Sequence, residues 1–216
     1  MPPTSTQVRT PSCPAWPKDA LRITFGIVWL IDAILKWLPG FRANYMGTIM
    51  GQAQGQPGWL HGWFDFWIRL QHPHVNLFVD LVATAETLIA VALIVGFARK
   101  FTYLAAIAFS LLIWATAEGF GGPYTSGSAD IGTAIIYALV FSALLALSYY
   151  AGPARFSVDY YLEPRISWWW RVAEMRQPVA REIGAHVQTD DTSTPLTAAG
   201  PVVSSLREQR EELLAK

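Results

Sequence analysis

Apolar residues gather in four long runs along this chain. The runs cover residues 20–38, 75–97, 101–117 and 131–150. A helix rises about 1.5 Å per residue, so runs of this length can cross about 30 Å of hydrocarbon, although the third is short. Backbone groups in lipid must be hydrogen-bonded within the protein, and helices achieve this within one segment. The pattern predicts an all-α membrane protein, a four-transmembrane-helix bundle.

The stretch between the first two runs is long but patterned. From Trp59 to Leu70 most residues are aromatic or aliphatic. The polar residues left among and after them recur at helical spacing: His61, Asp65, Arg69 and His72. This spacing predicts an amphipathic helix, which we expect to lie in the outer membrane interface.

Lysine and arginine residues mark one side of the predicted bundle. The loops on that side carry Arg9, Lys18, Arg22, Arg99, Lys100, Arg155, Arg165, Arg171, Arg176 and Arg181. The other two loops contain only Arg42 and Arg69. Because positive charge favours the cytoplasmic side, we expect both termini in the cytoplasm. The polar, proline-rich start lacks the pattern of a cleavable signal, so the first run should remain as an anchor.

Composition agrees with a membrane protein. The chain is 52% hydrophobic and 15% charged, and its mean hydropathy is +0.28. Its net charge is zero, so nothing global would attract nucleic acid. The single cysteine, Cys13, excludes an internal disulfide and any CxxC motif. The lipid bilayer is therefore the partner that composition supports.

The sequence divides into four predicted parts. They are a cytoplasmic segment (1–19), the membrane domain (20–152), a juxtamembrane interfacial segment (153–183) and a flexible tail (184–216). The tail is rich in Thr, Ser, Pro, Asp and Ala, which cannot bury enough apolar surface to fold. Ser205 and Glu208 match a capping box, which predicts a short terminal helix.

Ionisable residues lie in or beside the outer halves of the runs. They are Asp32, Lys36, Asp80, Glu86, Glu118 and Asp130. Such groups cost several kcal/mol at membrane depth unless they are paired or hydrated, so they often mark a site. The inner halves of the runs carry no acid. We therefore expect a polar cavity that opens away from the cytoplasm.

Asp32 and Lys36 are four residues apart, so they share one helix face and can pair. One interpretation is a structural pair in which Lys36 extends towards the surface. The other makes Lys36 a fixed cation that attracts an anion or donates to a carbonyl group. Glu86 is the deepest acid, about 16 Å inside its run. It should be protonated or paired with Lys36 or a tyrosine, and could serve proton transfer or a helix–helix hydrogen bond.

The glycine-rich stretch 117–133 joins the third and fourth runs and places Glu118 and Asp130 at the outer mouth. Asp130 could instead cap the fourth helix. In the first outer loop Met46, Met50, His61, His72 and His74 could hold copper, because soft sulfur and imidazole suit that metal. Pro73 should end the helix between these histidines. We assign no metal ligands.

Several short motifs together resemble the DoxX/DoxD-like family of small bacterial membrane proteins. They are Leu21-Arg22, Gly26, Asp32-Ala33 and Leu35-Lys36-Trp37 in the first run, Glu86 and Gly96 in the second, and Glu118-Gly119-Phe120-Gly121-Gly122-Pro123-Tyr124 and Asp130-Ile131-Gly132-Thr133 before the fourth. The resemblance covers residues 18–152. It implies a multi-pass protein of the bacterial plasma (inner) membrane, associated with thiosulfate:quinone oxidoreductase and a second small subunit. Other members are described as scaffolds of oxidoreductase complexes.

Three functions remain open from the sequence. The leading one is a quinone-linked redox subunit, in which the resemblance and the charges together select Glu86 and Asp32 for proton transfer. The substrate-binding candidates are Lys36, Glu118, Asp130 and Tyr124. Quinone is the expected cofactor, because no haem, flavin or iron–sulfur motif is present. The alternatives are a non-catalytic membrane scaffold and an outward-facing carrier of small molecules or metal.

Overall fold

The computed structural model describes residues 16–122, 131–150 and 156–175. These residues belong to one compact unit, Met1–Arg176. Every regular element in them is a helix, which confirms the predicted all-α class. Tyr124, Asp130 and the tail with its capping box lie outside the described residues, so those predictions stand as they were made.

A long helix occurs at each of the four apolar runs. The helices are α1 (Trp16–Lys36), α4 (Val75–Val95), α5 (Arg99–Thr116) and α6 (Thr133–Tyr150). Their ends differ from the predicted runs by a few residues, because polar residues such as Lys18 and Asp19 continue α1 beyond its apolar part. Two helical stretches, Gly58–Val95, which contains α4, and α6, are long and apolar enough to cross a membrane.

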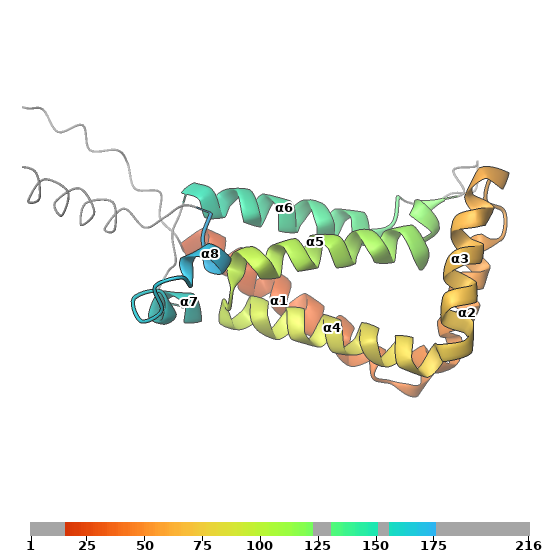
Figure 1. The fold of residues 1–216 in the computed structure, drawn as a ribbon, viewed down its shortest axis with the longest axis horizontal. Helices are drawn as coiled ribbons and strands as arrows, with labels where there is room; N and C mark the ends of the chain where they lie inside the picture. Colours follow the sequence, from red (N-terminus) through yellow and green to blue (C-terminus); the bar gives the residue numbers. More distant parts are fainter. Residues whose placement is uncertain (1–15, 123–130, 151–155, 176–216) are drawn as a thin grey trace, which may run out of the picture. The chain divides into compact units, whose positions relative to one another are not determined.

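The long helices pack as two pairs. α1 lies along α4 and α5 along α6, while α4 and α5 are joined by a tight turn and diverge from it (Figure 1). An aromatic core links the pairs: the Trp29 ring packs at 5.0 Å from Phe141, and Tyr103 is fully buried beside them. The divergence of α4 and α5 makes room for the site described below.

Two further helices follow α1 and precede α4 in the sequence. The predicted amphipathic helix is confirmed as α3 (His61–Gln71), and it follows a helix that the sequence analysis did not predict, α2 (Pro39–Ala53). α2 escaped notice because it holds three glycines and has little contrast between its faces. Its buried residues, Tyr45 and Ile49, pack with Val79 of α4. α2 and α3 cross the widened end of the α4–α5 pair (Figure 1).

Gly26 allows α1 to approach α4 closely. A Cβ at this position would lie 2.8 Å from Ile94 Cγ1 and 3.0 Å from the Ile94 backbone nitrogen. We expect Gly26→Val to push the helices apart and cost about 1–3 kcal/mol of unfolding free energy, the usual range for overpacking. Denaturant unfolding of the detergent-solubilised chain measures the loss. Gly47→Val is the matched control, because nothing lies within 4 Å of that Cβ; equal losses in both variants would contradict this account.

Residues 156–175 are fastened to the α4–α5 turn by one buried carboxylate. Asp159 lies in α7 (Val158–Leu162) and accepts hydrogen bonds from the backbone N–H groups of Ala98 and Arg99 at 2.8 and 3.0 Å. Arg99 Nε and Trp169 Nε1 donate to the same carboxylate at 3.1 and 2.9 Å. The positive φ of Ala98, 44°, helps to present consecutive N–H groups to one anion.

Two buried arginines complete this attachment. Arg99 also pairs with Glu174, just after α8 (Trp170–Ala173). Arg22 donates to the carbonyl oxygens of Ile94 at 3.0 Å and Phe156 at 3.1 Å. From the sequence, both arginines marked the cytoplasmic side and Arg22 also belonged to a family motif, yet each is at most 1% exposed. Acids and carbonyl groups distant in sequence surround them, which no local pattern reveals.

Candidate functional site

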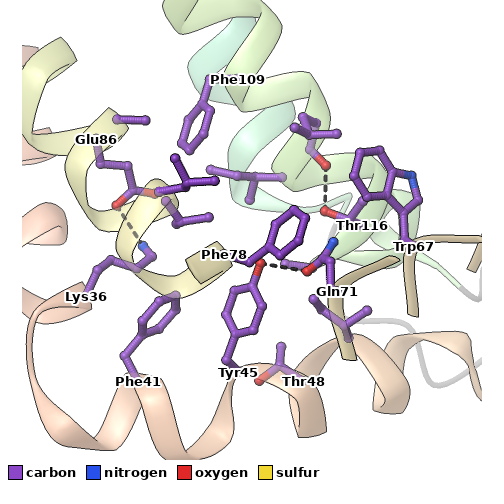
Figure 2. Close-up of a pocket in the computed structure, with 17 residues that line it drawn as sticks. Lys36, Phe41, Tyr45, Thr48, Trp67, Gln71, Phe78, Glu86, Phe109 and Thr116 are labelled. Carbon is purple, nitrogen blue, oxygen red and sulfur yellow. Dashed lines mark hydrogen bonds and ion pairs between the residues drawn. The ribbon is translucent and has the colours of Figure 1, made fainter. Parts of the chain in front are cut away.

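Three predicted site residues meet between α1 and α4. Lys36 Nζ lies 2.8 Å from Asp32 Oδ2 on its own helix and 3.1 Å from Glu86 Oε2 on α4. Figure 2 shows Lys36 and Glu86 facing each other across this contact. The predicted pairings of Lys36 with Asp32 and with Glu86 are both confirmed. One ammonium group thus serves two carboxylates, and the cluster carries one net negative charge when all three groups are ionised.

Burial increases steadily through the cluster. The Asp32 side chain is 46% exposed, Lys36 is 18% exposed and Glu86 is 2% exposed. Glu86 Oε2 pairs with Lys36 Nζ, whereas Oε1 has no hydrogen-bond partner among the described residues. A buried polar oxygen without a hydrogen bond is costly. Glu86 therefore retains capacity for a further hydrogen-bond donor.

A cavity of about 400 Å³ adjoins Glu86 and Lys36. Its lining comes from five helices: Lys36, Phe41, Tyr45, Thr48, Ile49, Trp67, Gln71, Phe78, Leu81, Val82, Ala85, Glu86, Phe109, Leu112, Ile113 and Thr116, together with Ala117 after α5. Among these residues only Lys36 and Glu86 are charged, and they sit together at one end (Figure 2). This combination of an apolar wall and a few converging polar groups is typical of sites for small organic molecules.

Helical periodicity explains how two helices form opposite walls. On α4 the lining residues begin at Phe78 and continue to Glu86 with spacings of three and four. On α5 the same spacing runs from Phe109 to Thr116. Residues three and four apart share one helix face, so each helix presents a single stripe to the cavity. The ionisable residue of the α4 stripe is Glu86, which places its carboxyl group at the cavity wall.

The cavity also has neutral polar groups, away from the ion pair. Tyr45 donates its hydroxyl to Gln71 Oε1 at 2.7 Å, joining α2 to α3 (Figure 2). Burial raises the pKa of Tyr45 to about 12, so the hydroxyl stays protonated. Sequence reasoning missed these groups because it did not predict α2. The spacing of Phe41, Tyr45 and Thr48 at helical intervals was the signal that could have found them.

The other two described acids among the candidates, Glu118 and Asp80, have other partners. Glu118 Oε2 accepts the backbone N–H of Ala134 at 2.9 Å, so its carboxylate caps the start of α6. Asp80 pairs with Arg42 of α2 on an exposed surface. Neither acid lines the cavity, and the structure therefore assembles Asp32, Lys36 and Glu86 without them.

The histidines between α1 and α4 were candidate copper ligands. In the described part of the chain, no three His, Cys, Asp or Glu side chains gather closely enough to hold a metal ion. His61 Nε2 instead lies 3.1 Å from the carbonyl oxygen of Gln56. His72 and His74 therefore belong to no such cluster among the described residues.

Comparison with protein-family models, with curated proteins and with solved structures finds no match for this chain. The resemblance to DoxX/DoxD-like proteins therefore depends on the motifs quoted above. Of those motifs, the structure brings Asp32, Lys36 and Glu86 into contact.

Proposed function

We propose that this chain is a multi-pass membrane subunit of a quinone-linked redox system. In this proposal α1, α4, α5 and α6 cross the bacterial inner membrane, with both termini in the cytoplasm. Large apolar side chains exposed on each helix support it, including Ile31, Leu88, Leu104 and Leu139. Exposed apolar surface on this scale is unusual for a soluble monomer and suits contact with lipid. The distribution of Lys and Arg supports the orientation.

The cavity beside Glu86 is the observation that carries the quinone assignment. An apolar aromatic wall suits a planar ring, and Lys36 offers an ammonium donor to a carbonyl oxygen. Glu86 Oε1 has no hydrogen-bond partner among the described residues, so a protonated Glu86 can donate its proton to a ring oxygen as the quinone is reduced. Lys36 connects Glu86 to the half-exposed Asp32, so protons can exchange with water along this cluster.

The charges favour a neutral ring over an anion. Two carboxylates already neutralise Lys36, so it has little attraction left for a thiosulfate ion. In the proposed reaction quinone takes up two electrons and two protons and becomes a hydroquinone. A reduced sulfur donor supplies the electrons, two thiosulfate ions losing one each as they join through a new sulfur–sulfur bond. We place that donor on a second subunit, as the DoxD-type resemblance suggests.

Substitution of the cluster should abolish most quinone reduction. We expect Glu86→Gln, which cannot deliver a proton to the ring, and Lys36→Met, which cannot donate to the carbonyl, each to lower turnover about 100-fold or more, the usual effect of losing a proton-transfer group. The assay follows quinone reduction in membranes given thiosulfate and related sulfur donors. Arg42→Gln is the control, because it removes an exposed ion pair outside the cavity. Unchanged turnover in both cluster variants would exclude this mechanism.

A further inference from the structure

The cavity has an apolar mouth between α4 and α5. Among its lining residues on these two helices, only Leu81 and Leu112 are exposed, at 53% and 38%. The other α4 and α5 residues of the lining are buried or half-buried. Exposure of two facing lining residues marks an opening of the cavity at the protein surface; on α2 the exposed lining residue is Thr48.

Both leucines lie at one level and on one side of the helix pair. At about 1.5 Å per residue, Leu81 is about 22 Å from the turn along α4 and Leu112 about 20 Å from it along α5. Leu81 follows Phe78 by one helical turn, and Leu112 follows Phe109 in the same way. When two antiparallel helices face each other, side chains that are the same number of residues beyond the facing position lie on the same side of the interface. Figure 1 shows α4 and α5 diverging towards this level.

Glu86 lies on the opposite edge of the α4 stripe, where α1 brings Lys36. The cavity therefore has a charged end against α1 and an uncharged opening on the other side of α4. We infer that its ligand is an uncharged amphiphile that enters sideways from the bilayer, with its head at Glu86 and a long apolar tail leaving between Leu81 and Leu112. This inference rests on the proposed quinone function and specifies a membrane-dissolved, tailed quinone.

The test compares two probes on the full chain in lipid nanodiscs: a benzoquinone with a decyl tail and the same benzoquinone without a tail. Quinone retained after rapid filtration gives the affinity. We expect Leu81→Trp and Leu112→Trp to weaken binding of the tailed probe about tenfold, the usual effect of blocking part of a hydrophobic pocket, and to change the tail-less probe little. Leu88→Trp is the control, since Leu88 is exposed on the same helix but does not line the cavity.

Three outcomes are distinguishable. A loss confined to the tailed probe and to the two mouth variants supports sideways entry. Wild-type binding of both probes that neither mouth variant alters overturns the inference and leaves the quinone function standing. If wild-type protein binds neither probe, both the inference and the proposed function fail. Thermal unfolding of each variant, with a midpoint like that of wild type, shows that a loss of binding comes from the mouth and not from unfolding.

Discussion

Arg99→Met should be the most destabilising single substitution considered for this chain. Arg99 is 1% exposed and pairs with Asp159 and Glu174, which are themselves buried. Removing its guanidinium leaves Asp159 and Glu174 in the interior without the arginine that pairs with both. Breaking a buried ion pair in this way typically costs about 3–5 kcal/mol. That loss is a large part of the total stability of an ordinary domain, about 5–15 kcal/mol.

Denaturant unfolding in detergent measures this effect, and the adjacent residue supplies the control. Lys100→Met removes the same charge from a half-buried side chain, whose ammonium group donates to the Arg171 carbonyl oxygen at 3.3 Å. We expect that control to lose less than about 1 kcal/mol. Arg99→Lys should fall between the two, because lysine keeps the charge but cannot reproduce the planar donor set. Similar losses for Arg99→Met and Lys100→Met would contradict a structural role for the buried arginine.

The sequence predicted those features whose residues all lie within one helix or one apolar run. Four runs predicted α1, α4, α5 and α6, and a polar stripe predicted α3. The spacing of Asp32 and Lys36 predicted their contact, since four residues make one helical turn. The cost of an isolated carboxyl group at membrane depth predicted a partner for Glu86, and Lys36 is that partner.

Features that depend on contacts between distant segments were beyond sequence reasoning. Arginine is usually a surface residue, yet residues 156–175 cover both Arg22 and Arg99. Arg22 donates to the Phe156 carbonyl oxygen, and Arg99 pairs with Asp159. The far end of the cavity depends on α2, whose three glycines and low contrast resemble a loop. From the sequence we expected Glu118 beside the cavity, but its carboxylate caps α6. In each case the partner is set by packing, which a single sequence does not record.

Lys36→Met should destabilise the chain by about 2–4 kcal/mol, somewhat less than loss of a fully buried ion pair because Lys36 is 18% exposed. Its cost comes mainly from Glu86, which would keep no nearby cation among the described residues. Glu86→Gln should therefore recover part of the loss when it is combined with Lys36→Met. A double-mutant cycle measured by denaturant unfolding should give a coupling of about 1–3 kcal/mol between residues in direct contact.

The exposed pair Arg42–Asp80 provides the matched cycle, because its side chains are 43% and 50% exposed and ion pairs of this kind contribute about 0–1 kcal/mol. Equal coupling in the two cycles would favour the structural alternative, in which Lys36 merely extends towards the surface. The combined variant Lys36→Met/Glu86→Gln also separates stability from activity. If the cluster is the proton-transfer site, this variant should be more stable than Lys36→Met and yet as deficient in quinone reduction. Recovery of turnover together with stability would show that the charges serve the fold alone.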